Sequence, residues 1–501
     1  MTSRRFLFCM IMLWLGVLIT PLYQLYQTNG LLLYANGIDE FSYLQYDYAQ
    51  ESLKHFHRYS QALTIYLHEL GLSGGWINLT FDVVCLALIA ILIQKCFALL
   101  SPSGTRIQTL LFFLVPSFFL TINPLWGSLV SINHSSWMLS WITLPSFTNS
   151  VFLRTPEPQA SYLLAALAIY LSLRFKHLLP ALIVAPLLYP FIALPWLFVV
   201  LSLLLEKSSR IPKVYIPVVV FVAMGLALRL YHLFLINAEA RGHLVTSYAP
   251  LVSVTGLFSL LLWRYLRKLI PTHLQQVSFL LALSPIAASN HQLISGWIAQ
   301  PNNFEQYWGT LAIAFIVSIT AIHSKKIARY ALFGSVPFLV LSFAVCFQRN
   351  FSNLHSLRLT DELLKTIQDN GSKVATNDAY ANLSLSMLYP MTQATSLSPI
   401  NAYLGMAERT IKDYRCTRAQ LLRDPHLKDE YSTLLSYMDQ SYQFETKDYF
   451  LNSIGRKKFT APLHRIDTPT HACRAQQILL YTIEDQSFHH LDISSSSFLD
   501  H

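Results

Sequence analysis

Long apolar segments alternate with shorter polar ones over residues 1–347. Eleven of them approach the length of a membrane-spanning helix, and they lie near 6–26, 76–98, 107–122, 159–173, 178–189, 190–205, 214–235, 249–263, 272–289, 308–322 and 329–347. A helix needs about 20 apolar residues to cross the hydrocarbon core of a bilayer. The pattern therefore predicts a polytopic α-helical membrane protein with about 11 transmembrane helices. Pro190 and Pro195 interrupt one stretch, which predicts two short helices or one re-entrant pair over 178–205.

The pattern changes after Gln348 to that of a soluble domain. The stretch "LRLTDELLKTIQDNG" predicts an amphipathic helix that ends at Gly371. The stretches "KVAT" and "ILLYTI" predict short strands. We therefore expect a transmembrane domain over 1–347 and a small α+β domain over 348–501.

Lysine and arginine gather in alternate connections between the apolar segments. They occur at Arg4/Arg5, Lys95/Arg106, Arg174/Lys176, Lys207/Arg210/Lys213, Arg264/Arg267/Lys268 and Lys325/Lys326/Arg329. Because basic residues concentrate on cytoplasmic loops, this pattern predicts a cytoplasmic N-terminus on an uncleaved first helix and an external domain 348–501. The net charge of +9 is then largely a matter of topology, and we expect no nucleic-acid partner. The composition agrees, since only 13% of the residues are charged, against about 25% in soluble proteins.

Four connections face outward in this topology, namely 27–75, 123–158, 236–248 and 290–307. The first outer loop, 27–75, contains two helix-like stretches at about 40–54 and 60–70. Their aromatic and leucine side chains suit helices that lie at the membrane surface. Packing of the loop on neighbouring helices is a compatible alternative.

The first outer loop also carries an acidic motif, "GIDEFSYLQYDYAQ". Asp39 and Glu40 follow the first apolar segment, and Tyr43 lies one helical turn after Asp39. An ionised carboxylate near hydrocarbon is costly to desolvate unless it has a partner. A carboxylate held there can act as a general base towards a hydroxyl or an amine. The alternative is an acidic first turn that favours the helix dipole.

Two outer arginines are candidates for binding a phosphate. Arg154 lies in "SVFLRTPEPQASYLL", just before a predicted helix, and Arg241 lies in the third outer loop. A guanidinium binds phosphate oxygens in bidentate fashion. The alternative for Arg154 is an arginine that extends its charge to the membrane interface.

The fourth outer loop has a composition that suits a sugar. In "SNHQLISGWIAQPNNFEQYWG", His291 and Gln292 belong to a run of neutral hydrogen-bonding side chains, and Trp297, Tyr307 and Trp308 offer flat faces. The alternative is an aromatic belt at the membrane interface. Asp82, near the outer end of the segment 76–98, is a weaker candidate for function.

These motifs and their order resemble those of the C-class (GT-C) membrane glycosyltransferases, which include protein O-mannosyltransferases and the aminoarabinose transferases that modify lipid A. The stretch "IDEFSY" looks like the family's D-E-x-x-Y motif. The stretches "LRTPEPQASYLL", "NHQLISG…QPNNFEQY" and "AERTIKDYRCT" are similar to segments found in bacterial members. The chain departs from the family in its second outer loop, where residues 123–158 contain Glu157 but no aspartate.

The resemblance implies an inverting glycosyltransferase of the plasma (inner) membrane with an external, periplasmic C-terminal domain. The donor would be a sugar on a polyprenyl phosphate, and the acceptor a lipid, a glycan or a protein. Asp39 would be the general base with Glu40 beside it, while Tyr43, Arg154, Arg241, His291 and Gln292 would bind the donor's phosphate or sugar. The residues imply no cofactor. Whether a divalent metal takes part, as the resemblance allows, is left open, and no spacing of metal-ligand residues in this chain supports one.

Three other functions compete with this one. A transporter or flippase of lipid-linked sugars would need acids or helix breaks near the middle of the membrane in several helices, whereas the polar groups here gather on the outer side. An oligosaccharide polymerase or ligase would use the same kind of donor through a large late loop, and the late loops here are short. A non-catalytic membrane scaffold would tolerate the loss of Asp39.

Overall fold

The computed structural model describes a helical bundle and several short strands. The described residues are 44, 46, 49–50, 53, 59–100, 122–123, 129–133, 136–139, 146–147, 155–207, 216–231, 244–246, 250–295, 297–299, 301–331, 333, 373–376, 476–482 and 487–493. The segments expected to be helical near 6–26, near 107–122, over most of 329–347 and up to Gly371 lie outside them.

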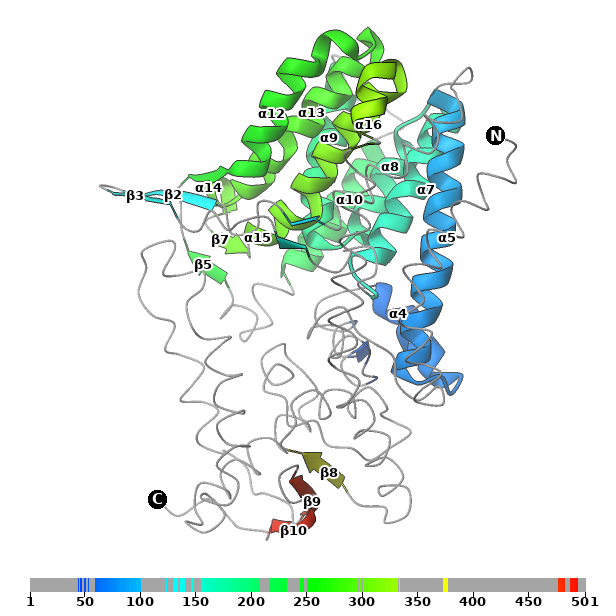
Figure 1. Cartoon of the computed structure of the whole chain (residues 1–501), viewed down its shortest axis with the longest axis vertical. Coiled ribbons are helices and arrows are strands. Elements are labelled where there is room, and N and C mark those ends of the chain that lie inside the picture. Colours follow the sequence, from blue (N-terminus) through cyan, green and yellow to red (C-terminus); the bar gives the residue numbers. More distant parts are fainter. Residues whose placement is uncertain are drawn as a thin grey trace.

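Helices occupy eight of the eleven predicted apolar segments, which confirms the predicted helical pattern there (Figure 1). The helices of the bundle are α5 (Gly74–Leu100), α7 (Gln159–Phe175), α8 (Leu179–Val184) with η2 (Ala185–Leu187), α9 (Pro190–Lys207), α10 (Ile216–Tyr231), α12 (Val254–Leu266), α13 (Thr272–Ser289) and α16 (Thr310–His323). By length and composition, α5 and the stretch Glu305–His323 are suited to cross a membrane, and α7, α9 and α10 are shorter apolar helices.

Shorter elements connect these helices. They are α4 (Ser60–Glu69), η5 (Arg267–Leu269), α14 (Gln292–Ser295), α15 (Pro301–Phe304) and η6 (Glu305–Gly309), a turn of π-helix that runs into α16. Four small sheets accompany them: β1 (Ile122–Asn123) with β4 (Ser146–Phe147); β2 (Leu129–Asn133) with β3 (Ser136–Leu139) and β6 (Leu251–Ser253); β5 (Leu244–Thr246) with β7 (Trp297–Ala299); and β8 (Lys373–Thr376), β9 (Gln476–Thr482) and β10 (Ser487–Ile493).

The C-terminal strands confirm the strands predicted from "KVAT" and "ILLYTI". β8 pairs in parallel with β9, and β9 pairs antiparallel with β10, so β9 is the central strand. A parallel pair needs a long crossover, and here about 100 residues separate β8 from β9.

The proline-rich segment forms a break followed by one helix. η2 ends at Leu187, Leu188 and Tyr189 are buried in the turn, and α9 begins at Pro190. A proline at the first position of a helix loses no hydrogen bond. Pro195 lies inside α9, so only one of the two prolines marks the break. The indole Nε1 of Trp196 donates to the carbonyl oxygen of Ala181 at 2.6 Å, which ties α9 to α8.

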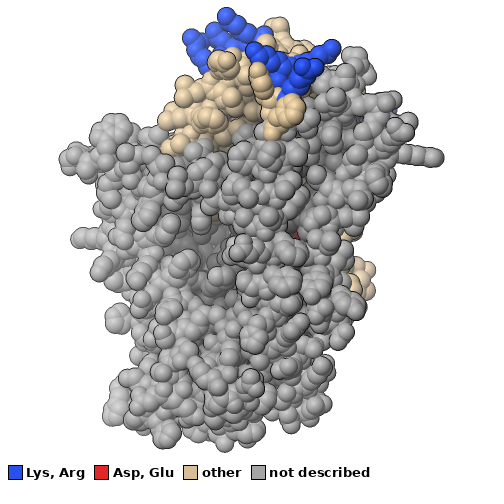
Figure 2. Space-filling view, viewed as in Figure 1, with Lys and Arg blue, Asp and Glu red and all other residues tan. Residues whose placement is uncertain are grey.

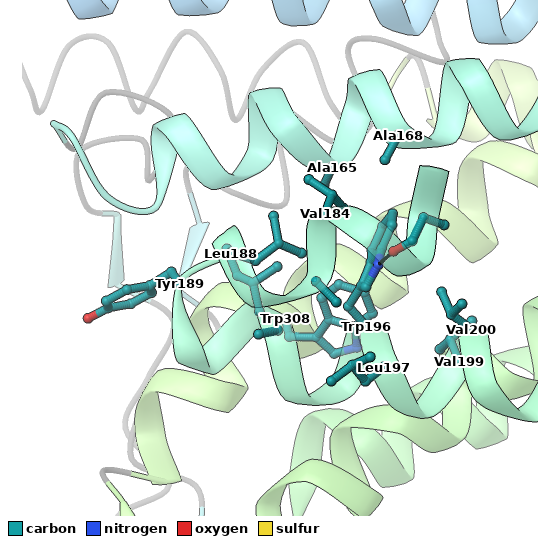
Figure 3. Packing of buried hydrophobic residues seen from close by; sticks show 14 of the residues in the cluster. Ala165, Ala168, Val184, Leu188, Tyr189, Trp196, Leu197, Val199, Val200 and Trp308 are labelled. Carbon is teal, nitrogen blue, oxygen red and sulfur yellow. Dashed lines mark hydrogen bonds between the residues drawn. The ribbon is translucent and has the colours of Figure 1, made fainter. Parts of the chain in front are cut away.

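The bundle core is built around two tryptophans whose indole groups both find hydrogen-bond acceptors. The Trp196 and Trp308 rings meet edge to face with centroids 6.4 Å apart (Figure 3). Trp308 Nε1 donates to Ser284 Oγ at 2.6 Å, which links η6 to α13. Tyr307 and Trp308 are buried in this core, and their predicted contact with a sugar stays a prediction.

Two glycines allow α12, α13 and α16 to approach closely. A methyl group at Gly256 would overlap Ile286 of α13, and one at Gly309 would overlap the Thr255 side chain of α12. α12 begins later than the predicted segment because Ser253 ends β6 and caps the helix, its Oγ accepting from Gly256 N at 3.0 Å.

Basic side chains lie together at one end of the bundle, blue at the top of Figure 2. We call this the basic end, and its residues are Arg264, Arg267, Lys268, Lys325, Lys326 and Arg329. Between the two ends, large apolar side chains stand exposed on α5, α10 and α12, for example Leu88, Phe221 and Leu261. Exposed apolar surface of this kind is typical of contact with a partner or a membrane.

Candidate functional site

Three buried carboxylates mark the opposite end of the described bundle, which we call the acidic end. Asp82 lies in the first half of α5, Glu157 just before α7, and Glu305 at the start of η6, and each is at most 4% exposed. Burying an ionised carboxylate is costly unless it is hydrogen-bonded or paired. The partners of these three groups therefore define how the acidic end is held together.

Asp82 joins α5 to the start of α7 through a buried polar cluster. Gln159 Nε2 donates to Asp82 Oδ1 at 3.0 Å, and Thr155 Oγ1 donates to Asn78 Oδ1 at 2.7 Å. Thr155 Oγ1 also lies 3.5 Å from Asp82 Oδ1. The cluster fixes Thr155 against α5, and Thr155 directly follows Arg154 in the chain.

Glu157 continues this arrangement towards the break before α9. Ser161 Oγ donates to Glu157 Oε2 at 2.7 Å and accepts from the backbone N–H of Tyr189 at 2.7 Å. The next residue is Tyr162, whose hydroxyl donates to the carbonyl oxygen of Tyr307 at 2.7 Å. The start of α7 is thus tied to both α9 and η6.

Glu305 connects three helices. Its carboxylate accepts from the backbone N–H of Thr255 at 3.0 Å and from the Thr255 hydroxyl, and Ser289 Oγ donates to its other oxygen at 3.4 Å. A carboxylate at the first turn of α12 also interacts favourably with the helix dipole. A π-helical turn such as η6 is often found at functional sites. Glu305 is the only acid between Glu239 and Asp361, a signal in the sequence that could have identified it.

The fourth outer loop is fastened at its two ends to the start of α12. Asn290 accepts from the N–H of Leu251 and donates to the carbonyl oxygen of Leu251, both at 2.8 Å. At the other end of the loop, Glu305 is bonded to Thr255, which follows Leu251 by four residues in the chain. The segment 291–304 is therefore held between two hydrogen-bonded anchors.

His291 and Gln292 lie in that segment. His291 Nδ1 is 2.8 Å from the carbonyl oxygen of Ala288, and its ring faces Phe304 at a centroid distance of 5.4 Å. Burial lowers the pKa of His291, although the bond to Ala288 opposes the shift. A neutral ring that donates from Nδ1 keeps Nε2 as an acceptor, which suits a hydroxyl better than a phosphate oxygen. Gln292 is fully buried, with its Nε2 3.4 Å from Asn290 Oδ1.

A short piece of the first outer loop lies against α5. Leu44 is buried among Ile77, Phe81 and Cys85 of α5. The His68 ring of α4 is bonded through Nε2 to the carbonyl oxygen of Leu44 at 2.7 Å. Burial lowers the pKa of His68, against the effect of its bonds to backbone oxygens. Residues 77–82 of α5 thus contact both Leu44 and Thr155.

The described structure brings together only part of the predicted site. Asp39, Glu40, Tyr43, Arg154 and Arg241 lie outside the described residues, and their assignments stay predictions. Within the described residues, no group of three or more His, Cys, Asp or Glu is placed to hold a metal ion. Searches against protein-family models, curated proteins and solved structures found no match to this chain.

We expect Glu305→Ala to destabilise the protein by about 1–3 kcal/mol, because it leaves the buried N–H and hydroxyl of Thr255 without their acceptor. Glu305→Gln keeps an acceptor oxygen and should lose less. Thermal unfolding in detergent measures both, with the exposed Glu69→Gln as control, for which we expect a change within about 0.5 kcal/mol. Equal stability of Glu305→Ala and wild type would contradict the anchoring role.

Proposed function

We propose that the protein is an integral membrane glycosyltransferase that moves a sugar from a polyprenyl-phosphate donor to an acceptor at the outer face of the membrane. The observation that carries the proposal is that residues 77–82 of α5 contact both Leu44 and Thr155. Asp39 precedes Leu44 by five residues, so their Cα atoms are at most about 18 Å apart. Arg154 immediately precedes Thr155 in the chain. A base and a phosphate-binding arginine are thereby tethered to one stretch of one helix.

The proposed chemistry follows from these two groups. Asp39 removes the proton from the acceptor's hydroxyl or amine as that atom attacks the anomeric carbon, which inverts the configuration. The bond from the anomeric carbon to the phosphate oxygen breaks, and the polyprenyl phosphate leaves. Negative charge develops on that oxygen in the transition state, where the Arg154 guanidinium stabilises it most. Arg241 is a second candidate for this charge, and Tyr43, His291 and Gln292 for contacts to the sugar.

The distribution of charge and apolar surface supports an outer-face reaction. Six of the described lysines and arginines lie together at the basic end (Figure 2). The three buried acids lie at the acidic end. With the basic end in the cytoplasm, the acidic end faces outward. A transporter would instead place ionisable groups near the middle of several helices. The transferase therefore accounts better for the buried acids among the described residues.

Asp39→Asn should lower the transfer rate about 100- to 10,000-fold, because the amide cannot accept the acceptor's proton. Transfer from a panel of sugar-bearing undecaprenyl phosphates measures this in reconstituted protein. The control is Glu69→Gln, which removes a charge from the same outer loop and should transfer like wild type. Full activity of correctly inserted Asp39→Asn protein would exclude Asp39 as the base.

Arg154→Ala should weaken donor binding about 10- to 100-fold, as expected for a lost charge-assisted hydrogen bond. Arg154→Lys should recover part of the affinity, since it keeps the charge without the bidentate geometry. Arg174→Ala, at the other end of α7, is the matched control and should bind donor normally. Unchanged donor affinity in Arg154→Ala would remove its phosphate-binding role.

The topology has its own test. A reporter fused after Lys326 should be active in the cytoplasm, and one fused after Gln348 should be active outside, because the predicted segment 329–347 separates them. The opposite pair of signals would show that the bundle has the reverse orientation in the membrane, with the acidic end in the cytoplasm.

A further inference from the structure

α4 is amphipathic in the reverse sense to a helix on a soluble protein. Its outer stripe is Tyr59, Leu63, Tyr66 and Leu70, which recur at helical spacing and are 45–60% exposed. Its inner face carries Gln61, Thr64 and His68, of which the first two are completely buried. Polar side chains thus point into the molecule and apolar ones out of it.

Several polar atoms on this inner face lack hydrogen-bond partners. Gln61 Nε2 and Oε1 and Thr64 Oγ1 are buried, and so is Ser73 Oγ at the start of α5. None of these atoms has a hydrogen-bond partner in the described structure. Buried polar groups in native proteins are nearly always hydrogen-bonded, because an unmet bond costs free energy. Such a set therefore indicates a polar partner that the described residues do not supply.

The position of this face relates it to the proposed reaction. His68, one turn beyond Thr64, is bonded to the carbonyl oxygen of Leu44, and the Tyr46 ring meets the His68 ring edge-on at 5.9 Å. The inner face of α4 therefore borders the segment that follows Asp39 and Glu40. The exposed stripe on the opposite side suits the outer membrane surface.

We infer that Gln61 and Thr64 form a subsite for the neutral, hydroxyl-rich sugar of the lipid-linked donor. This inference rests on the proposed function and deepens it by naming the residues that receive the sugar. An amide offers donors and an acceptor, and a hydroxyl offers both, which matches sugar hydroxyls. The face holds no carboxylate or basic side chain besides His68, whose pKa is lowered by burial, so a neutral group fits it better than a charged one.

The test uses Thr64→Val and Gln61→Leu, which keep the size of each side chain and remove its polar atoms. Each should raise the melting temperature in detergent, because apolar atoms replace buried polar atoms that have no partner. Each should also raise KM about 3- to 10-fold for the sugar-bearing undecaprenyl phosphate that wild type uses best. Binding of undecaprenyl phosphate without a sugar should stay as in wild type.

The matched control is Thr80→Val on α5. The Thr80 hydroxyl has a partner, the carbonyl oxygen of Trp76 at 2.8 Å, so this change should neither stabilise the protein nor alter KM. Lower melting temperatures in Thr64→Val and Gln61→Leu would indicate a structural role and overturn the subsite. Unchanged KM in both, with an active wild type, would also overturn it. A wild type that transfers from no donor in the panel would instead refute the proposed function, and the subsite with it.

Discussion

The acidic end of the bundle depends on one constraint, which is that each carboxylate buried there must be hydrogen-bonded. Asp82, Glu157 and Glu305 lie where water has almost no access. Leaving such a group without partners costs more than most single contacts contribute. The donors to Asp82 and Glu305 come from other helices, so satisfying these two carboxylates also joins the helices.

The glycines and the hydrogen bonds at Glu305 support each other. Gly309 lets the Thr255 side chain approach η6, and that approach brings the first turn of α12 within reach of the carboxylate. An alanine at Gly309 would therefore affect packing and hydrogen bonding together. The loop that carries His291 begins and ends at this junction, so its position follows from the same contacts.

The helices of the bundle could be predicted from sequence because their limits are marked by local chemistry. α13 has the predicted bounds, Thr272–Ser289, between Pro271 and the polar Asn290. The start of α12 differs from the prediction because pairing of β6 with β2 depends on a distant segment. The burial of Tyr307 and Trp308 could not be predicted, because an aromatic residue near a helix end has the same spacing whether it packs in the core or lies at the membrane interface. The inner face of α4 could not be inferred from periodicity alone, since periodicity separates two faces of a helix without saying which is buried.

A polyprenyl-phosphate sugar as donor would explain why the apolar face of α4 is exposed and its polar face is buried. Such a molecule has an apolar chain that stays in the bilayer and a sugar that must leave water to react. A helix at the membrane surface can meet both needs only when its apolar side faces lipid and its polar side faces the reaction site. The exposed stripe from Tyr59 to Leu70 and the buried pair Gln61 and Thr64 have this arrangement. The free energy that the unpaired polar atoms of the inner face cost would then be offset when the sugar hydroxyls bind, so donor binding would stabilise α4.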